Sequence, residues 1–137
     1  MFRWQTEDPY PDFADRNIVT VGMIEEYRAI EKIDEIAAAP GIDVLFIGTS
    51  DLSFSMGFRG KQDEPELQKA LDQVVAAARK HGKFVGRPAF NTASIPKFVE
   101  QGYQFFQAPS EVKMLSDGAK PYLDALGKSA SSAKANY

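Results

Sequence analysis

The 137-residue chain has the length of a single domain with one hydrophobic core, and its 44% hydrophobic and 26% charged residues are ordinary for a soluble globular protein. A net charge of -3 argues against nucleic acid or an anionic membrane surface as a partner. The chain has no cysteine and one histidine, His81, which excludes disulfides, thiolate metal ligands, a cysteine nucleophile and a multi-histidine zinc site within this chain.

The first part of the chain predicts two strands separated by a helix. Residues 1–17 form an aromatic and acidic lead segment, broken by two prolines, without the apolar stretch of a signal peptide. A β-branched run over 18–24 predicts a strand, and apolar residues at helical spacing from Glu25 to a Pro-Gly stop predict a helix. A second apolar run at 44–47 predicts a buried strand, and the stretch from Gly48 onward, with its further glycines, predicts a loop.

A longer helix and a third strand follow. Asp63 and Glu66 have the spacing of a capping box, and the apolar stripe after them predicts a helix that ends at Gly82. At the end of this helix, His81 has the position of an ordinary solvent-facing side chain. Residues 84–86 predict the third strand.

The last part of the chain predicts a fourth strand between two helices. Thr92 is expected to cap a short helix, and residues 103–108 are expected to form the strand. Ser110 is expected to cap a final helix that Gly118 and Pro121 interrupt.

The predicted elements alternate as four βα units. They form one domain, residues 18–127, followed by a small polar tail, residues 128–137, that is expected to fray. Near-continuous apolar strands that alternate with amphipathic helices indicate a parallel sheet of the α/β class. Two architectures remain open at this point: a small doubly wound sheet, and four of the eight units of a (β/α)8 barrel.

Acidic side chains follow the first two predicted strands. Glu25 comes directly after the first strand, and Asp51 follows the second. Sequential strands in such a sheet are usually neighbours, and ligands bind at the carboxyl ends of the strands, so both carboxylates are expected on one rim. A carboxylate pair completed by waters and substrate oxygens is typical of Mg²⁺ sites, whereas acidic residues also favour helix N-termini. On spacing alone, helix capping is the stronger interpretation.

The segment MIEEYRAIEKIDEIAAAPGIDVLFIGTSDLSFSMGF resembles the signature region of the HpcH/HpaI aldolase family, the metal-dependent 2-keto-acid aldolases of the citrate-lyase-like superfamily. The shared features are a strand ending in Glu, a helix of the E-x-I-D-E-I type, a Pro-Gly turn before Ile-Asp, and F-I-G-x-x-D-L-S. GKFVGRPAF resembles the seventh-strand segment of these proteins, and the similarity is weaker at YQFFQAPSEVKML. The resemblance covers most of residues 17–115 and implies the C-terminal half of a (β/α)8 (TIM) barrel.

The resemblance implies roles for particular positions. Glu25 and Asp51 fall on the two metal-ligand carboxylates of the family. Gly48, Thr49 and Ser50 fall on the loop whose backbone amides receive the carboxylate of pyruvate or a related keto acid. The implied cofactor is a divalent metal, Mg²⁺ before the alternatives Mn²⁺ and Co²⁺.

The remaining positions include departures from the family. Pro88 falls on an apolar wall of the substrate pocket, but Met23 stands where the family often has Gln, and Gly-Thr-Ser-Asp replaces a loop that usually reads Gly-Pro-Ala-Asp. Family members have an upstream half that supplies a catalytic Arg and a His-based acid/base group, and this chain has no counterpart of that half. His81 is not expected to replace them, and Arg87, near a strand end, either reaches the rim or is paired on the surface. The catalytic residues are therefore left unassigned.

The main functional prediction is a carbon–carbon lyase, an aldolase of the 2-keto-acid type in which a divalent metal stabilises a pyruvate enolate. The alternatives are a non-catalytic half-barrel that serves as a binding or assembly module, and a fragment of a citramalyl- or malyl-CoA-type lyase. The missing acid/base residues favour the non-catalytic alternative for the isolated chain.

The expected ligand is a small pyruvate-like 2-keto acid. The expected assembly is a homo-oligomer or a pairing with a missing N-terminal half, and the resemblance implies that the helix over residues 111–126 docks on another subunit. Because no run approaches the ~18 apolar residues of a membrane span, a cytoplasmic location is expected.

Overall fold

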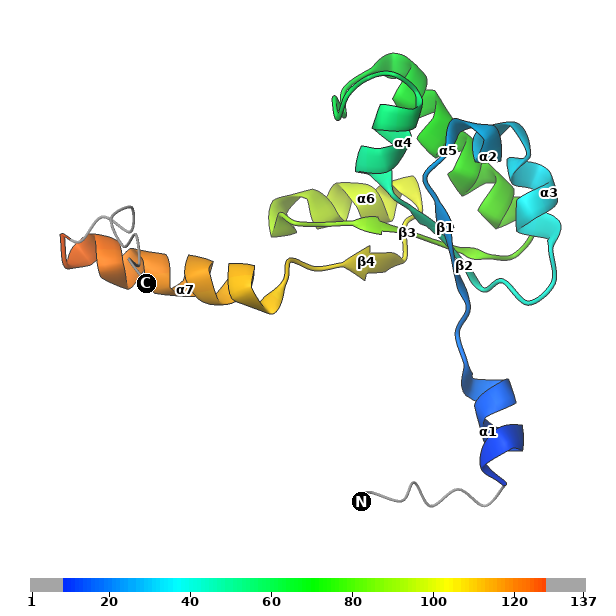
Figure 1. Ribbon diagram of the computed structural model, residues 1–137, viewed down its shortest axis with the longest axis horizontal. Coiled ribbons are helices and arrows are strands. Elements are labelled where there is room, and N and C mark those ends of the chain that lie inside the picture. The colour runs from blue at the N-terminus through cyan, green and yellow to red at the C-terminus, as the bar shows by residue number, and fades with distance from the viewer. Residues whose placement is uncertain (1–8, 128–137) are drawn as a thin grey trace, which may run out of the picture.

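The structure is a computed structural model that describes residues 9–127 (Figure 1). The predicted tail at 128–137 and the first eight residues of the lead segment lie outside the described residues. Helices and strands alternate along the rest of the chain. In order they are α1 (Tyr10–Asn17), β1 (Val21–Ile24), α2 (Tyr27–Glu31), α3 (Ile33–Ala38), β2 (Val44–Ile47), α4 (Thr49–Ser55), α5 (Pro65–Lys80), β3 (Phe84–Pro88), the 3₁₀ turn η1 (Thr92–Ser94), α6 (Ile95–Gln101), β4 (Phe105–Gln107) and α7 (Glu111–Ala125).

The four strands form one parallel sheet in the order β1-β2-β3-β4, which is also their order in the sequence. A doubly wound sheet reverses direction at a switch point, so its strands are not in sequential order. A (β/α)8 barrel adds each strand next to the preceding one and keeps its helices on the outside. The sequential order therefore selects the second of the two predicted architectures, and the chain forms four consecutive βα units of a barrel.

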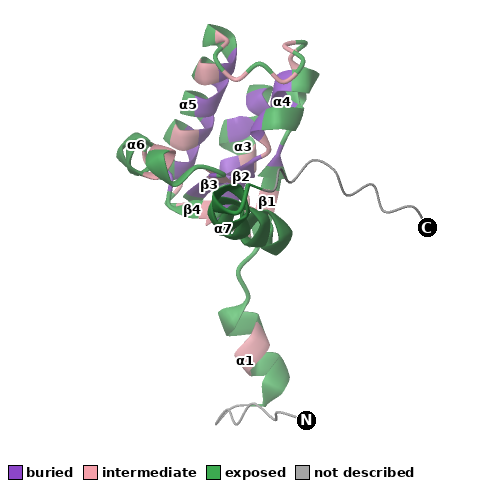
Figure 2. Cartoon of the chain, turned by 90° about the vertical axis from the view of Figure 1, so that its left-hand side faces the viewer, coloured by how far each residue is buried: buried purple, intermediate pink, exposed green. Residues whose placement is uncertain are grey.

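The hydrophobic core lies between the sheet and the helices on one of its faces (Figures 1 and 2). Alternate strand residues point into it because side chains in a strand alternate between the two faces. The longest helix, α5, contributes a buried stripe at helical spacing. The core residues from these elements are Ile24, Leu45, Ile47 and Val85 from the strands, and Leu67, Ala70, Leu71, Val74, Ala77 and Ala78 from α5.

The opposite face of the sheet, which corresponds to the interior of a complete barrel, carries exposed apolar side chains on β1, β3 and β4, whereas Val44 and Phe46 of β2 are buried on this face. Val21 and Met23 of β1 are 43% and 56% exposed, Phe84 of β3 is 53% exposed and Phe105 of β4 is 42% exposed. Four strands thus present one buried face and one open apolar face. In a TIM barrel this second face is filled by layers of side chains from all eight strands.

The helix α4 was not predicted, because the segment after Gly48 was interpreted as a loop. Its sequence contains serine and threonine, which favour caps and turns over helix interiors. Tertiary contacts stabilise it instead: Leu52 is fully buried, and so is Ser53. The Ser53 hydroxyl accepts a hydrogen bond from the Gly60 N–H (3.0 Å) and donates one to the Lys61 carbonyl (3.1 Å), so its burial is compensated.

The N-terminal predictions differ from the structure at three points. Residues 10–17 of the lead segment form helix α1, which buries no residue. The first strand begins at Val21, and Ile18 is 64% exposed outside it. The single helix predicted from Glu25 begins two residues later and is divided at Lys32 into α2 and α3.

Two of the three predicted helix caps are wrong. The N-cap of α5 is Glu64 without a side-chain hydrogen bond, because Pro65 occupies the first helical position, where its missing N–H has no cost. Asn91 rather than Thr92 caps the turn before α6, since its side chain accepts a hydrogen bond from the Ala93 N–H. The Ser110 cap of α7 is confirmed by a hydrogen bond from the Lys113 N–H to its hydroxyl (3.3 Å).

The helix α7 is continuous through Gly118 and Pro121, contrary to the prediction of an interruption. It carries no buried residue and extends away from the sheet (Figures 1 and 2). In the part of the chain from residue 9 to 127, no helix is both long and apolar enough to cross a membrane.

Candidate functional site

The carboxyl ends of β1 and β2 bring two of the predicted site residues together. The strands pair in register up to Ile24 and Ile47, and Glu25 and Gly48 directly follow these residues. A methyl group added at Gly48 would lie 3.1 Å from Glu25 Cβ and 3.3 Å from its Oε2. The absence of a side chain at Gly48 therefore leaves the space in which the Glu25 carboxylate lies.

Two hydrogen bonds hold the segment around Glu25 against α4. The Gly48 N–H donates to the Ile24 carbonyl at 3.0 Å, before α4 begins. The Tyr27 N–H donates to the Ser55 hydroxyl at 2.9 Å, at the end of α4. Because these bonds lie on both sides of Glu25, the position of its backbone relative to α4 is fixed.

The second predicted ligand, Asp51, lies in the first turn of α4, three residues after Gly48. Like Glu25 it is exposed, and neither carboxylate has a hydrogen bond or ion pair with any residue between 9 and 127. Neither carboxylate caps a helix by a hydrogen bond, because neither accepts one from the N-terminus of α2 or α4; Asp51 does lie in the first turn of α4, where acidic side chains are favoured. Both carboxylates thus have free oxygen atoms, Glu25 directly after β1 and Asp51 in the helix that follows β2.

This donor set fits a hard divalent cation that retains other oxygen ligands. Oxygen-only ligands suit Mg²⁺, which is usually held by one or two carboxylates together with waters and substrate oxygens. Among the described residues, no cluster of three or more histidine, aspartate or glutamate side chains could hold a metal ion.

The predicted carboxylate-binding residues lie at the beginning of α4. The first hydrogen bond of this helix runs from the Leu52 N–H to the Gly48 carbonyl. The N–H groups of Thr49, Ser50 and Asp51 precede that bond and have no acceptor within residues 9–127. Three backbone N–H groups in the first turn of α4 thus have no acceptor among the described residues.

The register of the sheet places Pro88 at the same rim. It follows Gly86 by two residues, as Gly48 follows Phe46, and Gly86 pairs with Phe46. Pro88 in turn pairs with Gln107 at the end of β4. We refer to these residues as the rim layer: Glu25, Gly48, Pro88 and Gln107.

Gln107 is an exposed polar side chain that the sequence prediction missed. The signal for it was present, since the predicted fourth strand included residue 107. Counting in steps of two from Phe105 would have placed its amide at the carboxyl end of the strand.

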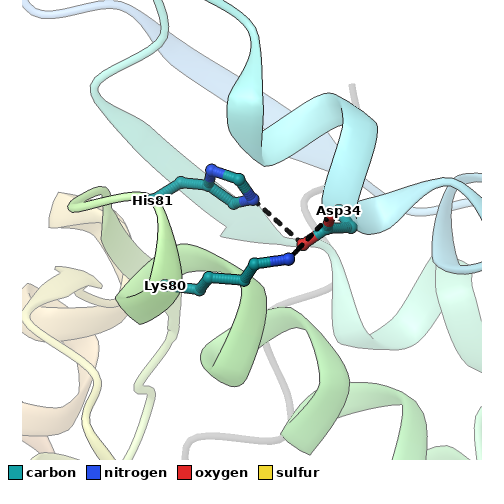
Figure 3. Close-up of polar contacts among 3 residues, drawn as sticks. All are labelled: Asp34, Lys80 and His81. Carbon is teal, nitrogen blue, oxygen red and sulfur yellow. Dashed lines mark hydrogen bonds and ion pairs between the residues drawn. The ribbon is translucent and has the colours of Figure 1, made fainter.

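His81 lies at the opposite edge of the sheet from the rim layer. It is the C-cap residue of α5 and precedes the start of β3, and its Nε2 is 2.9 Å from Asp34 Oδ1 (Figure 3). Lys80 binds both oxygens of the same carboxylate at 2.8 and 3.0 Å. His81 is therefore a partner of Asp34 rather than a solvent-facing side chain, and its place at the amino ends of the strands removes it from any chemistry at the rim.

The environment of the Asp34 carboxylate leads us to expect a contribution to the free energy of unfolding that is lost in acid. The hydrogen bond from Lys80, together with that from His81, lowers the pKa of Asp34 below its ordinary value of 3.8. A lowered pKa in the folded state stabilises the protein above the unfolded pKa, and this contribution is lost as the pH falls through the folded value. Asp34→Asn should therefore lower the urea midpoint slightly at pH 7 and leave it unchanged near pH 2.

The matched control is Asp117→Asn, since Asp117 pairs with Lys113 within α7 and joins no separate elements. It should leave the midpoint unchanged at both pH values. An Asp34→Asn effect of the same size at pH 7 and pH 2 would show that the carboxylate charge is not the cause.

Arg87 takes neither of the two positions that the sequence left open, which were the rim of the sheet and a pair on the surface. Its neighbour Gly86 faces the open side of the sheet, so Arg87 points toward the helices. The guanidinium carbon lies 3.8 Å from the ring centroid of Phe98 and 5.1 Å from that of Tyr103, a cation–π arrangement. Burial raises the pKa of the Tyr103 hydroxyl, and the positive charge of Arg87 partly offsets this effect.

The fold and the rim define half of a (β/α)8 barrel with two free carboxylates at its carboxyl edge. The family model described as HpcH/HpaI aldolase/citrate lyase matches residues 6–118, and the chain belongs to this family.

Individual relatives agree with this assignment. The chain is 31% identical over 121 residues to the 5-keto-4-deoxy-D-glucarate aldolase of Citrobacter koseri, a match that covers 86% of the chain and 47% of that protein. It is 34% identical over 103 residues to the hydroxypyruvate/pyruvate aldolase of Paraburkholderia phytofirmans, covering 75% and 40%. The crystal structure of an HpcH/HpaI aldolase/citrate lyase family protein from Burkholderia cenocepacia is similar with a TM-score of 0.79 and 29% identity, covering 87% of this chain and 46% of that one. The chain thus spans about half the length of the relatives it matches.

Proposed function

We propose that this chain is the metal-binding, C-terminal half of a 2-keto-acid aldolase, a carbon–carbon lyase. The observation that carries the proposal is the position of the Glu25 carboxylate, which lies against Gly48 at the carboxyl edge of the sheet. It has no hydrogen-bond or ion-pair partner among the described residues. Asp51 supplies the second free carboxylate from the neighbouring α4. Membership in a family of aldolases and lyases supports the reaction class.

Each residue of the rim has a role in this proposal. Glu25 and Asp51 hold a divalent ion, Mg²⁺ before Mn²⁺ or Co²⁺, and such an ion supplies the positive charge that stabilises an enolate. The amides of Thr49, Ser50 and Asp51 donate hydrogen bonds to the carboxylate of a pyruvate-type substrate. Pro88 provides an apolar wall on the neighbouring strand.

The acid/base group of the reaction is not among the residues of this rim. His81 lies at the other edge of the sheet, and Arg87 is directed toward Phe98. We therefore assign the proton transfer to a part of the complete barrel outside these four units. The same observation favours one alternative, in which the four units bind metal and keto acid but catalyse nothing.

The experiment that tests the metal site is thermal unfolding of the chain with and without Mg²⁺ or Mn²⁺. A ligand that binds only the folded state raises the melting temperature, and at a concentration 100 times its Kd it adds about 2.7 kcal/mol. Asp51→Asn and Glu25→Gln should each abolish most of this increase, because each removes one of two protein ligands.

The matched controls are Asp72→Asn on α5 and Glu35→Gln on α3, both exposed and remote from the rim. They should respond to the metal as the wild type does. Equal metal responses of the wild type and Asp51→Asn would overturn the proposed site.

A further inference from the structure

A serine hydroxyl at the end of α4 connects this helix to the segment that follows β1. The Tyr27 N–H donates a hydrogen bond to the Ser55 hydroxyl at 2.9 Å. Within residues 9–127, no other side-chain hydrogen bond and no ion pair reaches residues 25–27. Ser55 thus satisfies an N–H in the first turn of α2 from a different helix.

The two proposed metal ligands come from the two segments that this bond joins. Glu25 precedes Tyr27 by two residues, and Asp51 precedes Ser55 by four. Residues four apart in a helix lie on the same face, so Asp51 shares the face of α4 from which Ser55 contacts the other segment. Position 48, just before α4, also meets that segment, since a methyl group there would lie 3.1 Å from Glu25 Cβ. Both proposed ligands therefore lie between a contact at the start of α4 and one at its end.

The helix α4 is held from its other side by a separate set of hydrogen bonds. The buried Ser53 hydroxyl bonds to the loop after α4, and the Gln62 side chain donates to the Thr49 carbonyl at 3.4 Å. Loss of the Ser55 hydroxyl would leave these bonds intact. It would therefore loosen the segment that carries Glu25 and not the helix that carries the other ligand.

Binding of a divalent ion is sensitive to such loosening. Mg²⁺ requires near-ideal octahedral geometry with short oxygen distances, so carboxylates from two separate segments bind it well only when both segments are held in place. If one segment is loose, binding must order it, and the entropic cost of this ordering lowers the affinity.

We propose that Ser55 is a positioning residue of the metal site, whose hydroxyl fixes the segment of Glu25 against α4 and thereby holds Glu25 and Asp51 ready for a divalent ion. The inference rests on the proposed function, since it takes these two carboxylates as the ligands. Ser55 does not bind the ion itself, and its effect passes through the Tyr27 amide.

The test is titration of the metal-free 137-residue chain with Mn²⁺, in which free Mn²⁺ is measured by electron paramagnetic resonance. Ser55→Ala should bind Mn²⁺ about tenfold more weakly, the lower end of the usual effect of groups that orient metal ligands. Ser55→Thr keeps the hydroxyl and should retain most of the wild-type affinity. The matched control is Ser94→Ala, which removes an exposed hydroxyl bonded within its own turn and should leave the affinity unchanged.

A second measurement needs no metal. Amide hydrogen exchange of Tyr27, followed by NMR, should be slowed in the wild type and in Ser55→Thr and faster in Ser55→Ala. The melting temperature of metal-free Ser55→Ala should stay close to that of the wild type, because the lost bond is exposed and alanine favours a helix over serine. A loss of Mn²⁺ affinity at unchanged melting temperature distinguishes positioning from a general loss of stability.

The possible results separate this inference from the function on which it rests. Unchanged Mn²⁺ affinity in Ser55→Ala, or an equal loss in Ser55→Ala and Ser55→Thr, would overturn the role of the hydroxyl, while Mn²⁺ binding that is lost in Asp51→Asn would uphold the proposed function. Mn²⁺ binding that is absent in the wild type, or that persists unchanged in Asp51→Asn, would overturn the proposed function and the inference together.

Discussion

Replacement of Gly86 by alanine is expected to lower the free energy of unfolding by about 3 kcal/mol, the upper part of the usual range for overpacked cores. The added methyl would lie 2.8 Å from both a ring carbon of Phe46 and the backbone oxygen of Phe105, so a strand as well as a side chain must move. The measurement is urea unfolding monitored by circular dichroism.

The control for this substitution is Gly118→Ala in α7, where nothing lies within 4 Å of the added methyl. This variant should unfold at the same urea concentration as the wild type, or slightly higher, because alanine favours a helix over glycine. A Gly86→Ala variant as stable as the wild type would mean that β3 and β4 do not approach as closely as the structure shows.

Aldol cleavage by the 137-residue chain alone is expected to be negligible, even in the presence of the proposed metal. Acid/base catalysis by a positioned group contributes typically ~10²–10⁴-fold, and no such group lies on the rim formed by the described residues. Co-expression with the N-terminal half of a relative, such as the Citrobacter koseri aldolase, should restore turnover. The assay measures pyruvate released from a 4-hydroxy-2-keto acid in the presence of Mg²⁺ or Mn²⁺.

Glu25→Gln in the co-expressed pair is the control and should abolish the restored activity. Rapid release of pyruvate by the chain alone, lost in Glu25→Gln, would contradict the prediction and would identify an acid/base group within these four units.

The sequence predicts the architecture well because its buried strands are short uninterrupted apolar runs. The β2 strand, Val44–Ile47, was predicted at its true bounds, and all four of its residues are buried. The repeated change from this pattern to helical spacing was enough to indicate parallel βα units. The choice between barrel and doubly wound sheet depends on which strands are neighbours, and local periodicity carries no information about that.

The predictions that fail are those in which tertiary contacts outweigh local preference. The α4 segment is rich in serine and is helical because Leu52 and Ser53 are buried against the rest of the fold. The capping box at Asp63 is a common pattern, but Pro65 places the start of α5 one residue later than the pattern requires. The first outcome depends on contacts outside the helix, whereas the second follows from Pro65, a local signal that the prediction did not use.

The sequence predicts where the candidate site lies better than it predicts which contacts the site residues make. The rule that ligands bind at the carboxyl ends of parallel strands placed Glu25 on the rim, and its proximity to Gly48 agrees with that placement. The spacing alone favoured helix caps, because a one-dimensional pattern cannot distinguish a capping carboxylate from one without a partner. The exposure of Met23 was not predicted either, because the sequence of β1 is typical of a strand that is buried on both faces.

The contact between Gly48 and Glu25 couples these two positions. Gly48 has an ordinary backbone conformation, with φ of -75°, so the chain itself does not require glycine there. A methyl group at position 48 would meet Glu25 Cβ at 3.1 Å and its Oε2 at 3.3 Å, so the Glu25 side chain must shift by a few tenths of an ångström to admit it. A substitution at position 48 therefore moves the carboxylate on which the proposed metal site depends, without touching that carboxylate's own chemistry.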